Sequence, residues 1–383
     1  MDINELLKKA YSIGASDLHI KVGSPPIVRL FGELKPMEGI ERINLEEALK
    51  IAFSVMSPAQ KETFKKEHEL DFAYSIPDLG RFRCNAFYQR GAVGLVFRVI
   101  PMKVPTFEES NLPEVLKKIA MEQRGLILVT GTTGSGKSTT LAAMIDYINS
   151  NSAVNIITIE DPIEFVHRDK RSIVSQREIG SDTDSFLKAL RSALRQDPDV
   201  ILVGEMRDLE TIETALIAAE TGHLVMSTLH TLDAKETVNR IISMFPPHQH
   251  QQIRIQLASV IKAVISQRLL PKADGTGRAP AVEVMIGTLT IKECIADPEK
   301  TKLIPDVIAQ GKLLYGMQTF DQSLFDLYKA GLVTYEEALK WASNPDDFTL
   351  KVKGIQTTAE MVREGEGPEG QQKPGFKIER FSR

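Results

Sequence analysis

The sequence predicts an α/β protein in which a smaller α+β domain precedes a large domain with a parallel β-sheet. Beyond residue 113, short apolar runs alternate with helical patterns, as in sheets covered by helices on both faces. A glycine-rich loop joins one apolar run to a helical pattern, and three prolines within residues 101–113 divide the chain. We therefore expect domains at residues 1–100 and 114–350, a linker at 101–113, and a disordered tail at 351–383, where Gly365 to Gly375 is rich in Gly, Pro, Glu and Gln.

The first domain is expected to mix helices and strands. Helical patterns cover Ile3 to Ile13 and Leu45 to Met56, and alternating patterns cover Asp17 to Val22 and Ile27 to Leu34. A hairpin is expected to close the domain, with a turn at Gly91 and Gly94 and a return strand from Val93 to Ile100 that contains Arg98. In its first strand, alternation puts Phe82, Cys84, Ala86 and Tyr88 on one face and Arg81, Arg83 and Asn85 on the other.

The second domain is expected to contain a buried parallel sheet followed by helices. Its predicted strands are Leu126 to Thr130, Ile156 to Ile159, Val200 to Val203 and Leu224 to Met226. After about Asp297 the pattern is mostly helical, most clearly from Gln318 to Lys329 and from Tyr335 to Ala342.

Composition narrows the class of protein. The net charge is -4, with 42% hydrophobic and 26% charged residues, which is ordinary for a globular protein and argues against a nucleic-acid partner. The two cysteines, Cys84 and Cys294, form neither a disulfide framework nor a metal-ligand spacing, so a reducing cytoplasm is expected. We find no secretory signal and no stretch of 18 apolar residues. Contact with a membrane is therefore expected only through partners.

A phosphate-binding loop follows the first predicted strand of the second domain. The segment from Gly131 to Ser138 reads GTTGSGKS and fits the pattern G-x-x-x-x-G-K-[ST], with a helical pattern after it. Its glycines let backbone N–H groups surround phosphate oxygens at a helix N-terminus. We expect Lys137 to reach the β- and γ-phosphates of ATP and Ser138 to hold Mg²⁺. The residues predicted to bind ATP are Gly131, Thr132, Thr133, Gly134, Ser135, Gly136, Lys137, Ser138 and Thr139.

Acidic residues follow two neighbouring predicted strands, where ligands of open parallel sheets bind. Pro162 ends one strand, so Glu160, Asp161 and Glu164 cluster at its carboxyl end. Another strand leads to Glu205, the place of a Walker B acid, although Gly204 precedes it and Glu replaces Asp. One acid should activate the attacking water while another holds Mg²⁺ through water, and the residues alone leave open which does what. Helix caps or salt-bridge partners are the alternative interpretation.

Histidines lie at both ends of another predicted strand. His230 is at the carboxyl end, where a sensor of the γ-phosphate would lie, whereas for His223 a purely structural role stays open. Neither has a Cys or Asp at ligand spacing, so a metal site built on these histidines is not expected.

Taken in order, the motifs resemble the secretion ATPase superfamily. They are Asp-Leu-His at Asp17 to His19, the phosphate loop, TIEDPIEF at Thr158 to Phe165, LVGEMRDLET at Leu202 to Thr211, and TGHLVMSTLHT at Thr221 to Thr231. The segment YGMQTFDQSL, from Tyr315 to Leu324, resembles the twitching-motility branch, the type IV pilus retraction ATPases. The resemblance spans about residues 1–345.

The resemblance implies a homohexameric ring whose subunits pair a PAS-like N-terminal domain with a RecA-like P-loop ATPase domain. It implies ATP hydrolysis coupled to pilus disassembly, at the cytoplasmic face of the inner membrane and through a membrane platform protein. By motif, Glu164 becomes the base, with Glu160 and Asp161 assisting, and Glu205 the Walker B acid. His223 and His230 match the family's His box, and Arg81, Arg83 and Arg98 match arginines that reach the γ-phosphate. Exposed charges on an edge strand are the alternative for Arg81 and Arg83.

Departures from the family pattern bear on the direction of the motor. A long extra N-terminal domain and a four-cysteine zinc site are usual in pilus-extension and type II secretion relatives, and both are missing here, which favours retraction. However, Leu289 to Pro298 departs from an Ala-Ile-Arg motif tied to retraction, so extension or secretion stays open. A RecA-like nucleic-acid motor is a less favoured alternative because no basic stripe interleaved with aromatics is present. A scaffold that binds nucleotide without hydrolysis is disfavoured by the set of carboxylates.

Overall fold

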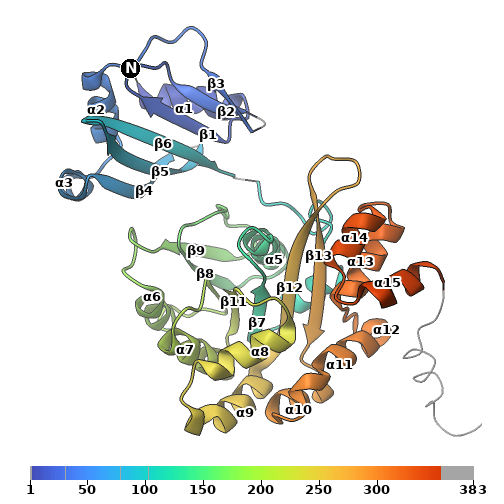
Figure 1. Ribbon diagram of the computed structural model, residues 1–383. Coiled ribbons are helices and arrows are strands. Elements are labelled where there is room, and N and C mark those ends of the chain that lie inside the picture. Colours follow the sequence, from blue (N-terminus) through green and yellow to red (C-terminus); the bar gives the residue numbers. More distant parts are fainter. Residues whose placement is uncertain (1, 31, 78, 102, 355–383) are drawn as a thin grey trace, which may run out of the picture.

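The structure is a computed structural model that describes residues 2–30, 32–77, 79–101 and 103–354. It contains two β-sheets, one formed before residue 101 and one formed after residue 124 (Figure 1). The segment expected as a disordered tail falls almost entirely outside the described residues. Its first two residues belong to the helix α15, Pro345–Val352, because Asn344 caps that helix and Phe348 is buried on it.

The N-terminal sheet is antiparallel, with strand order β3-β2-β1-β6-β5-β4. Its strands are β1 Asp17–Lys21, β2 Ile27–Leu30, β3 Glu33–Pro36, β4 Glu69–Ile76, β5 Gly80–Gln89 and β6 Ala92–Ile100. The helices are α1 Ile3–Ser12, α2 Leu45–Ser54 and α3 Pro58–Glu67, and each begins at a residue whose side chain caps it: Asp2, Asn44 and Ser57. Helices and strands share one hydrophobic core that includes Leu7, Ile51 and Phe82.

Three details of this domain differ from expectation. The single strand expected from Ile27 to Leu34 is two strands, β2 and β3, and the turn between them contains Gly32 at φ 86°. Gly94 lies within β6, and the hairpin turn is made by Arg90 and Gly91 instead. Tyr88 lies on the face of Phe82, as expected, but near the end of the strand it is 37% exposed, and its ring stacks on the buried Phe64.

The second sheet has seven strands in the order β13-β12-β7-β11-β10-β8-β9. They are β7 Gly125–Thr130, β8 Asn155–Glu160, β9 Ile173–Glu178, β10 Val200–Val203, β11 Leu224–Leu229, β12 Ile261–Pro271 and β13 Arg278–Ile286. All neighbours pair in parallel except β13, which returns antiparallel along β12. The carboxyl ends of β7, β8, β10 and β11 therefore meet at one edge.

Helices cover both faces of this sheet. On one face α4 Val115–Ala120 and α5 Lys137–Asn151 pack on apolar residues such as Ile127, Ile156 and Leu202. On the other face lie α6 Phe186–Ala193, α7 Leu209–Glu220, α8 Ala234–Ser243, α9 His250–Val260, α10 Leu289–Ala296 and α11 Ile304–Gln310. Short 3₁₀ turns at Pro247–Gln249 and Thr301–Leu303 precede α9 and α11.

The remaining helices follow α11, and α13, α14 and α15 share a small core whose hairpin residues lie at the outer end of β12 and β13. They are α12 Lys312–Tyr315, α13 Phe320–Lys329, α14 Tyr335–Trp341 and α15. Phe320 and Leu324 of α13 share a small core with Leu270, Ala279 and Ala281 of the hairpin. This group of helices lies beside the hairpin in Figure 1, away from the strands β8 and β9.

The linker is attached to the second domain along part of its length. Phe107 is 3% exposed and packs edge-on against Tyr147 of α5, with ring centroids 5.5 Å apart. Glu108 also forms an ion pair with Lys117 of α4. Pro101 and Lys103, by contrast, are exposed. Among the described residues between Ile100 and Phe107, none is buried.

Candidate active site

The loop between β7 and α5 needs glycine at three positions. Gly131, Gly134 and Gly136 have φ angles of 139°, 79° and 95°, which residues with a side chain rarely adopt. A Cβ on Gly131 would lie 2.5 Å from the carbonyl oxygen of Gln267, so even alanine would displace the loop. Gly136 is the N-cap of α5, and the first N–H groups of that helix have no intrahelical acceptors. This backbone can receive an anion.

Lys137, the first residue of α5, curls back over the loop. Its Nζ donates to the carbonyl oxygens of Gly131 at 2.9 Å and Thr132 at 3.0 Å. Burial lowers the pKa of this ammonium, while the carboxylates of Glu205 and Glu164 act in the opposite direction. A phosphate entering the loop would offer the ammonium a stronger partner than two carbonyls.

A cavity of about 330 Å³ opens beside the loop and collects most of the predicted side chains. From the loop and α5 it is lined by Thr133, Gly134, Lys137 and Ser138. From strand ends it is lined by Glu160, Asp161, Glu164, Glu205 and His230. Glu160 is the last residue of β8, Asp161 and Glu164 follow that strand, and Glu205 follows β10, as expected for acids at strand ends.

The acids after β8 have different surroundings. Glu160 is half-buried, and its Oε1 accepts hydrogen bonds from Thr158 Oγ1 at 2.6 Å and Gln176 Nε2 at 3.1 Å. Burial raises the pKa of Glu160, and these two hydrogen bonds offset only part of the shift. Glu164 and Asp161 are exposed at the cavity. A group that takes a proton from water must be accessible, which favours Glu164 or Asp161 over Glu160.

Glu205 is paired with two cations or potential cations. Its Oε2 accepts from Arg207 at 2.8 Å, and its Oε1 lies 3.1 Å from His230 Nε2. Thr228 of β11 fixes the turn before it by donating to the carbonyl oxygen of Gly204 at 2.7 Å. Glu205 and His230 thus form one contact between the ends of β10 and β11.

His223 is not part of this cavity. It precedes β11, and its Nδ1 lies 2.9 Å from the carbonyl oxygen of Ala218 at the end of α7. His230 follows the same strand, so the strand's length of about 20 Å, at about 3.3 Å per residue, separates the two histidines. In this structure His223 holds the α7–β11 turn.

Each of the three N-terminal arginines pairs with a carboxylate outside the cavity. Arg81 Nη2 lies 3.1 Å from Glu178 Oε2, which belongs to the second domain. Arg83 Nε lies 3.9 Å from Asp71 Oδ1 on the neighbouring strand β4, and Arg98 Nε lies 3.0 Å from Asp17 Oδ1 on β1. In the described residues, none of these arginines lines the cavity at the phosphate loop.

Several residues of the site were not assigned a role from the sequence. Gln176 of β9 binds both Glu160 and the segment after it, and Arg207 binds Glu205. Gln267 of β12 donates to Thr140 Oγ1 at 2.8 Å beneath the loop. For Arg207, its place two residues after Glu205 could have indicated that it contacts that acid. Gln176 and Gln267 lie on strands that were not predicted, so the sequence offered no such signal for them.

A second cavity of about 260 Å³ lies on the other side of the loop. Its lining includes Leu112 of the linker, Thr139 of α5, Leu269 of β12 and Arg278 of β13. Two of its lining side chains, Ser135 and Gln267, are 3% and 2% exposed and each has a polar atom without a partner, Ser135 Oγ and Gln267 Oε1. Buried polar atoms of this kind can bind a polar ligand that reaches them.

No cluster of three or more His, Cys, Asp or Glu side chains that could hold a metal ion occurs among the described residues. A metal at the loop would therefore need oxygen ligands from a nucleotide besides those of the protein, as Mg²⁺ does in nucleotide sites. Ser138 and Glu205 line the same cavity and supply the hydroxyl and carboxylate oxygens that suit Mg²⁺. In the part of the chain that the structure describes, we also find no helix long and apolar enough to cross a membrane.

A phosphate loop at the carboxyl edge of a mainly parallel sheet, facing acids from nearby strand ends, defines a P-loop ATPase. Comparison with known proteins gives the family. The chain belongs to the type II/IV secretion system protein family, whose model matches residues 1–311.

Three relatives illustrate the similarity. The type IV pilus retraction ATPase PilT of Pseudomonas aeruginosa is 47% identical over 91% of this chain and 100% of its own length. A twitching motility protein of Neisseria gonorrhoeae is 46% identical over 85% of this chain and 86% of its own. The crystal structure of the pilus retraction motor PilT with bound ADP superposes with a TM-score of 0.83 at 47% identity, covering 91% of this chain and 98% of that one.

Proposed function

We propose that this chain is the motor subunit that powers retraction of type IV pili by hydrolysing ATP. The observation that supports this best is the combination of full-length similarity to retraction ATPases with a cavity where the phosphate loop meets Glu164 and Glu205. The subunits are proposed to form a homohexamer in the cytoplasm, attached to the inner membrane through a pilus platform protein.

In the proposed mechanism the triphosphate binds the amides from Gly131 to Thr139, and Lys137 exchanges its two carbonyl acceptors for phosphate oxygens. Glu164 takes a proton from the water that attacks the terminal phosphorus. Its exposure supports this role, whereas Glu160 is half-buried and its carboxylate is already hydrogen-bonded. Glu160 and Asp161 are proposed to orient the base, and His230 to sense the terminal phosphate through its contact with Glu205.

Mg²⁺ would be held by Ser138 directly and by Glu205 through water, and when bound it offsets the charge of the phosphates. The adenine ring and the ribose of ATP are proposed to occupy the second cavity. This cavity offers apolar contacts from Leu112 and Leu269 and the unpartnered atoms of Ser135 and Gln267. The linker would then contact the nucleotide through Leu112.

Arg83 and Arg98 are proposed to contact the nucleotide only after the domains reorient, whereas Arg81 is already paired with Glu178 of the second domain. Arg83 and Arg98 pair with Asp71 and Asp17 of their own domain, so reaching a terminal phosphate requires a movement of the N-terminal domain. For His223, whose partner is a backbone carbonyl at the far edge of the sheet, we propose a supporting role in place of contact with nucleotide.

Two measurements test the function. The purified chain should release phosphate from ATP, and a deletion strain should have abundant pili that do not retract. A strain without pili would assign the chain to pilus assembly instead, which the departure of α10 from the retraction motif leaves open. Absence of phosphate release by the assembled protein would reject the ATPase mechanism.

A further inference from the structure

Glu178 connects the two domains at a point that the established motifs do not include. It is the last residue of β9 and lies in register with Glu160 of β8. Its side chain is 6% exposed and makes an ion pair with Arg81 of β5, whose Nη2 lies 3.1 Å from Glu178 Oε2. The same Oε2 accepts the backbone N–H of Ile163 at 3.1 Å. One oxygen therefore binds both the N-terminal domain and the residue just before Glu164.

Gln176, on the same face of β9 two residues earlier, holds the other side of Glu164. Its Nε2 donates to the carbonyl oxygen of Phe165 at 2.9 Å, and its Oε1 accepts the N–H of His167 at 2.8 Å. The backbone on both sides of Glu164 is thus fixed by β9 side chains. Glu178 differs from Gln176 in having a partner in the other domain.

The contact with Arg81 does not satisfy the guanidinium fully. Arg81 Nε is buried without a hydrogen-bond partner, although a guanidinium can donate five hydrogen bonds. A permanent structural ion pair normally satisfies its buried donors. If Arg81 leaves, the buried carboxylate of Glu178 still accepts the N–H of Ile163 and, at 3.4 Å, the hydroxyl of Ser181. It then lacks a cation, and a buried charge without a counter-charge is unfavourable. Movement of the N-terminal domain is therefore expected to move the backbone at Ile163.

We propose that Glu178 is a positioning residue that couples the N-terminal domain to Glu164. While Arg81 is paired with Glu178, the segment from Asp161 to His167 keeps the arrangement seen in this structure. Movement of the N-terminal domain breaks this pair and changes the position of the Glu164 carboxylate. This inference rests on the role proposed above for Glu164. The residues on the two sides of the contact also line a shared cavity, with Arg83 and Ala73 on one side and Asp161 and Glu178 on the other.

A double-mutant cycle tests the coupling. Glu178→Gln keeps an acceptor for the Ile163 N–H and removes the charge that binds Arg81, and Arg81→Gln removes the other charge. Each single variant should lower kcat for ATP hydrolysis roughly ten-fold, the size expected for coupling between contacting groups. KM for ATP should change less than about two-fold, because neither residue lines the cavity at the phosphate loop. The double variant should be no slower than either single variant. Arg81→Lys, which keeps the charge, should recover part of the rate.

Controls separate this result from a loss of folding and from failure of the proposed function. Lys188→Gln breaks an exposed ion pair with Asp184 at α6 and should leave kcat within about two-fold. ADP binding reports that each variant is folded. The coupling would be overturned if the two reductions in kcat multiplied in the double variant, or if either single variant kept the wild-type kcat. Absence of turnover in the unmodified chain would instead reject the proposed function. Undiminished turnover in Glu164→Gln would reject Glu164 as the base, and with it the coupling, but not the ATPase function.

Discussion

The carboxylates of the cavity differ in what they can do because their partners differ. Glu160 is half-buried and accepts two hydrogen bonds, Glu205 is paired with Arg207 and His230, and Glu164 is exposed. A general base must reach the attacking water, and of these three carboxylates only that of Glu164 belongs to a residue exposed to solvent. The assignment of the base to Glu164 therefore has a physical argument beside the family motif.

Glu164→Gln tests that assignment. Removal of a general base costs about 100-fold or more in rate, whereas an amide of the same shape should disturb nucleotide binding little. We expect kcat to fall by at least about 100-fold and the dissociation constant for ADP to stay within a few fold, as measured by phosphate release and by titration with a fluorescent ADP analogue. Glu213→Gln, on the exposed side of α7, is the matched control and should keep the wild-type rate. Hydrolysis at an undiminished rate in Glu164→Gln would contradict the assignment.

The residues of the cavity divide by how they could be found. Lys137, Glu160, Glu205 and His230 were predicted because each follows or starts an element whose end had to lie at the carboxyl edge of the sheet. The partners of Arg81 could not be predicted in this way. Strand alternation correctly placed Arg81 on the face of its strand opposite Phe82. Its partner Glu178, however, is almost one hundred positions away in another domain, and no local sequence pattern indicates such a contact.

Among the strands of the second sheet, the short apolar ones were predicted and β9, β12 and β13 were not. Val200–Val203 and Leu224–Leu229 are fully buried and read as apolar runs. β9 is an edge strand with the sequence IVSQRE, too polar to stand out. β12 begins directly after the last residue of α9, and β13 forms a long hairpin with β12. No turn residue in the sequence therefore marks the change from helix to strand. The antiparallel edge of the sheet was missed for this reason.

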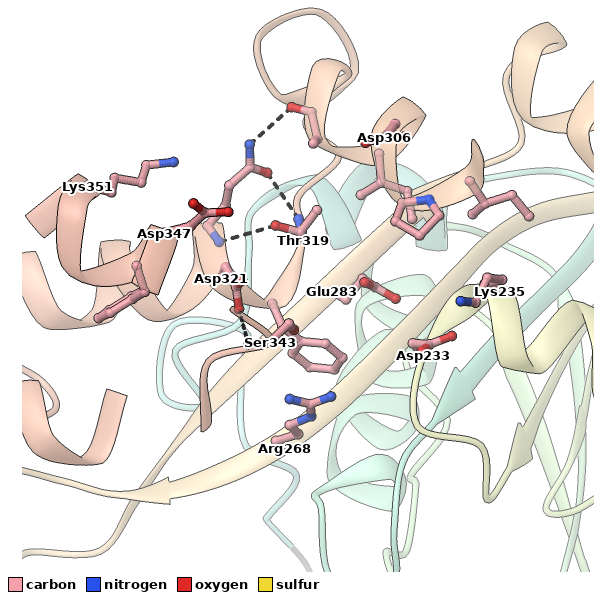
Figure 2. Close-up of a pocket in the computed structure, with 17 residues that line it drawn as sticks. Asp233, Lys235, Arg268, Glu283, Asp306, Thr319, Asp321, Ser343, Asp347 and Lys351 are labelled. Carbon is pink, nitrogen blue, oxygen red and sulfur yellow. Dashed lines mark hydrogen bonds between the residues drawn. The ribbon is translucent and has the colours of Figure 1, made fainter. Parts of the chain in front are cut away.

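Glu283 of β13 joins that edge to the helix α8. Its side chain is 6% exposed, and its carboxylate accepts the N–H of Ala234, the first residue of the helix, at 2.9 Å. Figure 2 shows it within a cavity of about 440 Å³ that Asp233 and Arg268 also line. Burial raises the pKa of Glu283 from 4.5 to about 7, with the charge of Asp233 acting in the same direction.

This shift predicts a pH-dependent stability. Between pH 4.5 and about 7 the folded state keeps a proton on Glu283 that the unfolded state releases, so stability decreases as the pH rises through this window. Glu283→Gln stays neutral and can still accept from Ala234, and it should lack this loss. Its free energy of unfolding relative to wild type should therefore rise by on the order of 3 kcal/mol between pH 4.5 and 8. Urea unfolding of both proteins at each pH measures this, and a difference that does not vary with pH would contradict the shift.

At the scale of the whole molecule, the connection between the domains is shorter than the sequence indicated. Three prolines suggested a linker from residue 101 to 113, but Phe107 is buried against α5 and Glu108 is paired with Lys117. The second half of the linker therefore moves with the ATPase domain. We therefore expect the angle between the domains to change at residues 101 and 103–105, none of which is buried. Such a change would also alter the contact between Arg81 and Glu178.

Lengthening this segment should separate hydrolysis from movement. Doubling the length of a flexible connection weakens the docking of its ends by only about 0.6 kcal/mol, or roughly three-fold. Insertion of Gly-Ser-Gly-Ser-Gly after Lys103 should therefore leave ATP hydrolysis within about three-fold of wild type, as measured by phosphate release. The same insertion should abolish pilus retraction in cells, because a slack connection cannot transmit a change of angle as force. Inserting these residues after Gly331, in an open turn between α13 and α14, provides the control and should preserve both activities. Retraction at the normal rate with the long linker would mean that force passes between the domains through their contact surface alone, and the hinge would then lose its mechanical role.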